Sequence, residues 1–202
     1  MNHLLRLARG IDRLNDGLGQ IAKWAVLASC FISAGNALVR YLLRESSNGW
    51  LEIQWYLFAV GVMFGAAQVL RVNEHVRVDV LYGRYSSRGK VLVDLFGLVC
   101  FLLPVIGLLT WLSWQFFVVK LLSGMTPADT LEGLGLQAYA WKLLSSGEMS
   151  SNAGGLIRWP VALTLPAGFA LLLLQGVSEI IKRVGWLANR HDMSTHYERP
   201  LQ

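Results

Sequence analysis

The sequence predicts an all-α integral membrane protein with four membrane-spanning helices, an N-terminal amphipathic helix and a further outer-surface helix between spans three and four. Three observations lead to this fold: four long apolar runs, few charged residues and an uneven distribution of Lys and Arg. Hydrophobic residues make up 54% of the 202 residues and charged residues only 15%, against about a quarter in soluble domains. A globule of this size could not bury so much apolar surface, so we expect lipid to surround the chain.

The four apolar runs cover about residues 24–43, 53–70, 91–119 and 159–181. A helix needs roughly 20 residues to cross a hydrocarbon layer of about 30 Å, and each run is about that long or longer. Asp94 and Glu179 lie near the ends of runs three and four, beside basic residues with which we expect them to pair. The prediction is one four-helix membrane domain over residues 1–185, followed by a tail at 186–202.

The N-terminal segment carries a helical stripe of apolar residues at three- and four-residue spacing: Leu4, Leu7, Ile11, Leu14 and Leu18. Arginines and aspartates occupy the rest of the helical wheel. A basic amphipathic helix before a span can lie in the headgroup plane, extend the span into the cytosol or pack on the cytosolic face of a partner. The sequence leaves these three alternatives open.

Lys and Arg residues indicate the direction of the spans, because short cytoplasmic loops carry an excess of them. Thirteen of the 18 lie before span one, between spans two and three, or after span four. The other five lie in the two remaining loops: Arg40, Arg44, Lys120, Lys142 and Arg158. We therefore expect both termini to be cytoplasmic. This placement explains the net charge of +5 without a nucleic-acid partner.

The outer loop of residues 120–158 is long enough to hold structure of its own. Thr126 and Pro127 predict a turn, and Asp129 is a candidate cap for a surface helix that continues through Leu144. Ser and Gly residues between Ser145 and Gly155 predict an irregular loop.

Motifs for catalysis or cofactor binding are missing from the sequence. None of the four His residues lies inside a span, so no haem-binding pair is expected, and no hydrolase, metalloprotease or nucleotide-binding motif occurs. Cys30 and Cys100 are interpreted as small buried packing residues. We predict a protein that is not an enzyme, binds no cofactor and has no row of polar residues suited to a substrate path.

Glu52 is a charged residue at a span boundary, and we expect it to have a partner of opposite charge. It precedes span two by one residue, and we expect it to pair with Arg40 or Arg44 at the end of span one, because a short acidic side chain reaches water poorly from lipid. Deeper in the spans, Asn36 and Gln68 are expected to hydrogen-bond between helices.

The loop between spans two and three contains alternating charged and β-branched residues at His75–Val80. Arg77, Asp79 or His75 could make a contact that holds the start of span three at the inner surface. An ordinary positively charged cytoplasmic loop would explain the arginines but not the alternation.

Seven segments along the chain carry a resemblance to a known family: Glu52–Phe58, Gly65–Ala67, His75–Tyr82, Gly147–Ser150, Gly154–Pro160, Pro166–Leu171 and Gln175–Glu179. Together they resemble the small permease subunit of tripartite ATP-independent periplasmic (TRAP) transporters. The resemblance covers roughly residues 20–185, and residues 120–145 depart from it by their length.

The resemblance implies a bacterial inner-membrane complex. A large multi-span permease would move organic acids with a sodium gradient, a periplasmic binding protein would deliver them, and this subunit would be a fixed scaffold in the lipid. The candidate partner-contact residues are Arg40, Glu52, Trp55, His75, Arg77, Asp79, Glu148 and Trp159. Two other classes remain as alternatives: a membrane-embedded redox or quinone-linked enzyme subunit, and a free-standing four-helix sensor or assembly protein.

Overall fold

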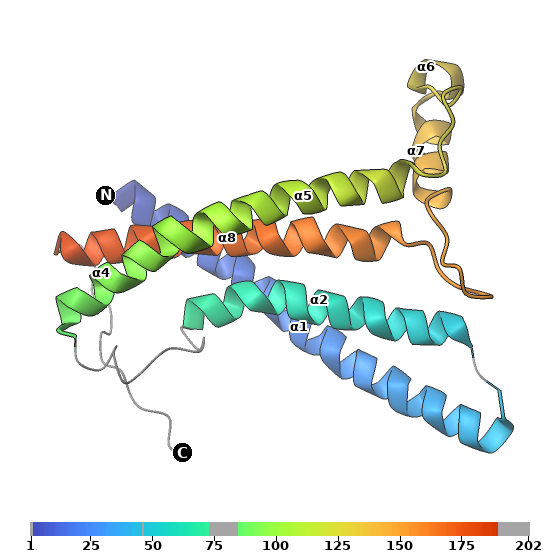
Figure 1. Ribbon diagram of the computed structural model, residues 1–202, viewed down its shortest axis with the longest axis horizontal. Helices are drawn as coiled ribbons and strands as arrows, with labels where there is room; N and C mark the ends of the chain where they lie inside the picture. Colours follow the sequence, from blue (N-terminus) through green and yellow to red (C-terminus); the bar gives the residue numbers. More distant parts are fainter. Residues whose placement is uncertain (1, 46, 73–84, 190–202) are drawn as a thin grey trace.

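The computed structural model describes residues 2–45, 47–72 and 85–189, and it confirms the all-α prediction with four helices long and apolar enough to cross a membrane. The first two spans are α1 (Asn2–Leu43) and α2 (Asn48–Val72) (Figure 1). The third is continuous through α4 (Ser87–Gly97), the π-helical segment η1 (Leu98–Leu102) and α5 (Leu103–Leu122). Two short helices, α6 (Leu131–Leu134) and α7 (Leu136–Ser145), precede the last span, α8 (Trp159–Leu187).

Helix α8 lies at the centre of the bundle. It packs against α5 on one side and against α2 and α1 on the other (Figure 1). In its most apolar 18-residue window 44% of the residues are buried, against 6% to 11% in the other three spans. The start of α1 and the end of α8 mark one end of the bundle, here the terminal end, and α6 and α7 project from the opposite end, here the loop end.

The N-terminal amphipathic helix and the first span form one continuous helix of 42 residues. Of the three alternatives for this segment, the structure shows an extension of the span. Three leucines of its apolar stripe point outward: Leu4, Leu7 and Leu14 are 49%, 54% and 49% exposed, whereas Ile11 of the same stripe is buried together with Asn15. The face of this helix that meets the bundle therefore combines apolar and polar residues.

The second residue of α5 is a proline, Pro104, and the helix accommodates it with a π-helical turn. Pro104 has no N–H to donate and its ring would collide with the carbonyl four residues earlier in a regular helix. In η1 the Leu103 N–H instead bonds the Leu98 carbonyl, five residues back. The π-helical turn thereby keeps the third span continuous past the proline.

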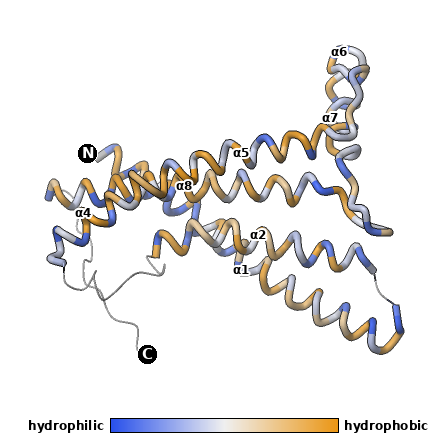
Figure 2. Tube along the Cα trace, in the orientation of Figure 1, coloured by the Kyte–Doolittle hydropathy of each residue, from blue (hydrophilic) through white to orange (hydrophobic). Residues whose placement is uncertain are grey.

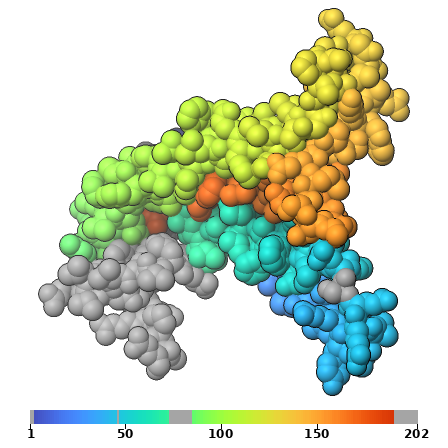
Figure 3. All heavy atoms as spheres, turned by 45° about the vertical axis from the view of Figure 1, so that its right-hand side comes forward, coloured from blue at the N-terminus to red at the C-terminus, as the bar shows by residue number. Residues whose placement is uncertain are grey.

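Much of the outer surface of the first three spans is apolar. Figure 2 shows apolar residues along most of the length of these helices, and Figure 3 shows the segment around residues 125–145 standing out from the bundle. Large side chains such as Trp24, Phe31 and Phe101 lie open on this surface. Cys30 and Cys100 are exposed there as well, so the interpretation of both as buried packing residues is wrong. Each lies on a helix face turned away from the neighbouring spans.

Close contact between α2 and α8 depends on a glycine. A Cβ placed on Gly168 would lie 2.9 Å from the Met63 backbone oxygen and 2.6 Å from its Cβ. Small residues permit such approach between spanning helices, and dispersion forces then act along the whole contact. Gly176 has the same role in the contact with the third span. A Cβ placed on Gly176 would lie 2.8 Å from Leu102 Cδ2.

Replacing Gly168 with Ala should push α2 and α8 apart. We expect a loss of about 1–3 kcal/mol of stability, the usual cost of overpacking, in spite of the better helix propensity of Ala. Thermal unfolding of the purified protein in detergent measures it. Gly65→Ala is the matched control, because a Cβ there meets nothing within 4 Å. Equal melting temperatures for the two variants would contradict the close-packing argument.

Candidate functional site

The loop between α5 and α8 folds into two short helices where we predicted one. The chain breaks at Gly135, whose φ of 74° is in the left-handed region that favours glycine. The cap is Thr130, whose hydroxyl accepts from the Gly133 N–H at 3.1 Å. The prediction of Asp129 as the cap is therefore wrong by one residue, and its carboxylate has another role.

Asp129 ties the turn before α6 to α7. Its carboxylate accepts from the Thr126 N–H at 2.8 Å and the Thr126 hydroxyl at 2.7 Å, and it pairs with Lys142 Nζ at 2.6 Å. The hydrogen bond from Lys142, with those from Thr126, lowers the pKa of Asp129 to about 2. The ionised carboxylate thus keeps the turn closed at neutral pH.

Glu52 joins the start of α2 to the loop that leads into α8. Its carboxylate accepts from Asn152 Nδ2 at 2.9 Å, from the Leu156 N–H at 2.7 Å and from the Ser150 hydroxyl. The side chain is enclosed, because the residue is only 8% exposed. We name this arrangement the Glu52 clasp.

The expected pairing of Glu52 with Arg40 or Arg44 is wrong. Both arginines are exposed at the end of α1, and the clasp takes its donors from a loop about a hundred residues further along the chain. Sequence spacing favoured the nearer arginines, whereas the fold brings a neutral loop with three donors to the carboxylate. A short Ser- and Gly-rich loop gives little sign of such a role.

Glu148 links the end of α5 to the start of α8. Its carboxylate pairs with Lys120 Nζ at 2.5 Å and with Arg158 NH1 at 2.9 Å. Its main chain continues the link, since the Arg158 N–H donates to the Glu148 carbonyl at 2.8 Å. The hydrogen bond from Lys120 is the main reason that the pKa of Glu148 is lowered.

The remaining candidate residues divide into three groups. Trp159 donates its indole N–H to the Leu144 carbonyl at 2.9 Å and so fixes the end of α7 on the start of α8. Trp55 and Arg40 are exposed on the outer surface, Trp55 by 68%. His75, Arg77 and Asp79 lie outside the described residues.

A second cluster of polar residues lies at the terminal end, between α1 and α8. Gln175 is fully enclosed; its Oε1 accepts from Asn15 Nδ2 at 2.7 Å and its Nε2 donates to Asp12 Oδ1 at 2.9 Å. The Ser178 hydroxyl also donates to Asp12, at 2.9 Å, and Lys182 Nζ lies 3.3 Å from the same carboxylate. The first and last spans are therefore joined by a hydrogen-bonded network.

Ion pairs extend this network to the third span. Glu179 pairs with both Lys182 and Arg183 on its own helix, which confirms the predicted local pairing. Arg183 NH2 also reaches Asp94 Oδ2 of α4 at 3.2 Å. Charges this deep in a bundle are costly unless paired, and here each cation lies between carboxylates of different helices.

The terminal-end network includes a row of polar residues on one span. We predicted no row suited to a substrate path; Gln175, Ser178 and Glu179 form a row on α8, opposite Asp12 and Asn15. The three- and four-residue spacing of these side chains along residues 175–183 is visible in the sequence and could have revealed the row. Their mutual hydrogen bonds make it a structural contact between helices.

The part of the chain that the structure describes contains no candidate metal site. No three side chains among its His, Cys, Asp and Glu residues gather as a metal site would require. At both ends of the bundle polar side chains bond to one another, and among the described residues only Asn15 Oδ1 and Arg183 Nε are buried without a hydrogen-bond partner. What the geometry defines is a four-span helical membrane protein with polar links between its helices at each end.

Comparison with protein families identifies this membrane protein more closely. A model of the family described as tripartite ATP-independent periplasmic transporters, DctQ component, matches residues 29–185, well over half of the chain. The chain belongs to this family, and it is thus a small permease subunit of the TRAP type. No significant match was found among curated proteins or among solved structures.

The match begins at Ser29, so it includes the Glu52 clasp but only part of the terminal-end network. Gln175, Ser178 and Glu179 lie inside the matched region, whereas Asp12 and Asn15 lie before it. Residues 2–28 of α1 therefore supply their half of this helix contact from outside the region that defines the family.

Replacing Glu52 with Gln should open the clasp, because an amide carries no charge and turns an N–H₂ group toward donors. We expect the Leu156 amide to exchange its hydrogen at least about tenfold faster, since hydrogen bonds to a charged acceptor are the stronger ones. Hydrogen–deuterium exchange measured by mass spectrometry follows the loop. Glu132→Gln, on exposed α6, should leave the rate unchanged, and an unchanged rate in Glu52→Gln would refute the clasp.

The turn held by Asp129 should stay closed at a lower pH than a turn held by a carboxylate of ordinary pKa. Its folded pKa of about 2 is below the usual 3.8, so its stabilising effect is complete above about pH 4 and is lost as the pH falls through about 2. The NMR shift of the Thr126 amide during a pH titration reports the change. Asp129→Asn should remove this transition; a midpoint near 4 in the unaltered protein would contradict the hydrogen-bond assignment.

Proposed function

We propose that this chain is a non-catalytic scaffold that holds the large, multi-span permease of a TRAP transporter in the bacterial inner membrane. The observation that carries the proposal is the contrast between a cross-linked interior and an uncovered exterior. Polar contacts join the spans at both ends of the bundle, and glycines bring them together between those ends. The outer faces of α1, α2 and α5 remain apolar.

This contrast suits a part that stays still while its partner moves. A bundle that changed shape during transport would need helices free to slide, but Gly168 lies directly against Met63, and Glu52 and Arg183 link separate elements of the bundle. The uncovered apolar faces offer area for a second membrane protein as well as for lipid. Membership of the family supplies the kind of partner.

The wider transport reaction belongs to the same proposal. The large permease carries an organic acid with sodium ions, a periplasmic binding protein delivers the acid, and this subunit takes no part in the chemistry. The loop end, built from α6, α7 and the loop held by Glu52, is the surface that the binding protein would meet. Residues 1–185 act as the membrane domain and residues 186–202 as a cytoplasmic tail.

Copurification tests the scaffold role. The tagged chain, coexpressed with the large permease encoded beside it and extracted in mild detergent, should elute with that permease in a fixed ratio. The same tagged chain coexpressed with an unrelated multi-span transporter is the control and should elute without it. Elution of the chain alone in both cases would overturn the proposal.

The proposed topology predicts which residues a membrane-impermeant thiol reagent reaches. In a background of Cys30→Ala and Cys100→Ala, Ser151→Cys at the loop end should react in spheroplasts, because that end faces the periplasm. Ala188→Cys, after the end of α8, should react only once the membrane is permeabilised. Both positions are exposed, so access depends on the side of the membrane alone. The reverse pattern would invert the topology.

A further inference from the structure

Helices α1 and α2 separate toward the loop end. Near the terminal end a Cβ on Gly19 would lie 2.2 Å from Gln68 Oε1, and further along one on Gly61 would lie 2.4 Å from the Val26 side chain. Ser29 still donates to the Gln54 carbonyl at 3.0 Å. Beyond this point the contact ends: a Cβ on Gly35 would meet nothing within 4 Å, and Figure 1 shows the two helices diverging.

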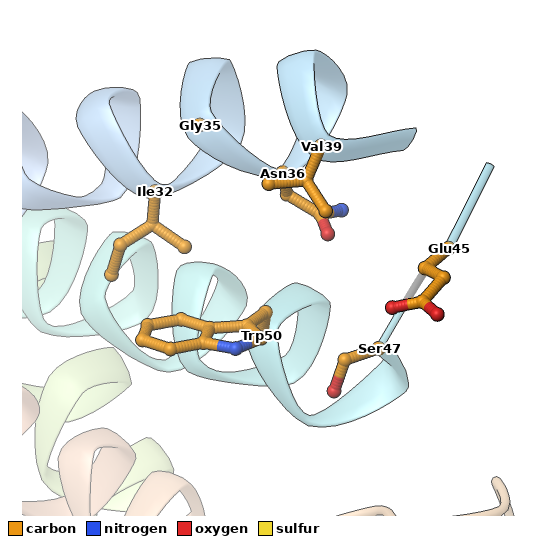
Figure 4. A pocket seen from close by; sticks show the side chains of 7 residues that line it. All are labelled: Ile32, Gly35, Asn36, Val39, Glu45, Ser47 and Trp50. Atoms are coloured by element: carbon orange, nitrogen blue, oxygen red, sulfur yellow. The ribbon is translucent and has the colours of Figure 1, made fainter. Parts of the chain in front are cut away.

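The space between the diverging helices is a pocket of about 400 Å³. Figure 4 shows Ile32, Asn36 and Val39 extending from α1 toward the Trp50 ring on α2. Glu45 and Ser47, from the connection between the helices, stand at its outer end. Gly35 completes the lining.

The pocket changes character along its length. Ile32 and the Trp50 ring line its inner part, Asn36 and Val39 lie side by side further out, and the carboxylate of Glu45 and the hydroxyl of Ser47 stand at its outer end. Trp residues favour the boundary between hydrocarbon and headgroups, so Trp50 places the outer part at headgroup level. The pocket therefore suits an amphiphile with its apolar part inward.

The charges at the mouth indicate what the headgroup carries. Glu45 presents a carboxylate that would pair with a cation. Arg40 is not among the residues that line the pocket, but it directly follows the lining residue Val39 and is exposed, so it adds a positive charge to this part of α1 that could pair with a phosphate. A headgroup with both a phosphate and a primary ammonium meets both charges, whereas an anionic headgroup would leave Glu45 opposed to negative charge.

We propose that the α1–α2 pocket binds one zwitterionic phospholipid of the phosphatidylethanolamine type. Its first acyl segments lie against Ile32, Val39 and Trp50, its phosphate meets Arg40, and its ammonium meets Glu45. Asn36, expected from the sequence to bond another helix, instead offers its amide to the glycerol ester region. The lipid thus fills the space that the separating helices leave open.

Native mass spectrometry of the full chain tests this proposal. The protein is delipidated in detergent, and phosphatidylethanolamine or phosphatidylglycerol with the same acyl chains is added back at equal concentration. We expect a single retained phosphatidylethanolamine and a preference over phosphatidylglycerol of about fivefold, the size of one partly exposed ion pair. Glu45→Gln should remove the preference, and Arg40→Gln should weaken the binding of both lipids.

A steric block separates this pocket from general lipid binding. Gly35→Leu places a side chain in the pocket at a position where a Cβ meets nothing within 4 Å. Gly17→Leu is the matched control on the same helix, since a Cβ there also meets nothing within 4 Å. The retained lipid should be lost in Gly35→Leu and kept in Gly17→Leu. Equal retention in both variants, equal binding of the two lipids, or loss of the lipid when the large permease is bound would each overturn the assignment.

Discussion

Everything in this bundle is arranged around α8, the single span that is enclosed by others. Since lipid tails are as apolar as leucine, burial alone does not drive helices together in a membrane, and close packing with polar contacts must do so. Helix α8 supplies both. Gly168 allows α2 to pack closely against α8, and Gly176 does the same for the third span. The polar residues of α8 from Gln175 to Arg183 bond to side chains of α1 and α4.

The two polar clusters hold separate elements of the bundle together, one at the loop end and one at the terminal end. At the loop end Glu52, Glu148 and Asp129 hold irregular backbone in place, because a loop has no helical hydrogen bonds of its own to keep it there. At the terminal end Arg183 and Asp12 connect regular helices. Fastening of the helices at both ends is what the proposed scaffold role requires.

Hydropathy and charge were sufficient to predict the number of spans, their approximate limits and the local pairing of Glu179, because these depend on runs of residues along the chain. Glu52 and Asp12 show where such reasoning ends. The donors to Glu52 come from a loop about a hundred residues away, and the inward direction of Asp12 follows from its contact with α8. The orientation of α1 likewise depends on its neighbours: Leu4 and Leu7 are exposed, whereas Ile11 on the same apolar stripe is buried.

The bond between Asn15 and Gln175 spans 160 positions in the sequence, and this separation has a consequence for biogenesis. Chains are synthesised from the N-terminus, so Asp12 and Asn15 of α1 lack their partners until the final span has been made. Water or headgroups must satisfy these groups in the interval. Closure of the bundle is therefore a late event in synthesis, and a ribosome that stops before α8 releases three spans without the helix that joins them.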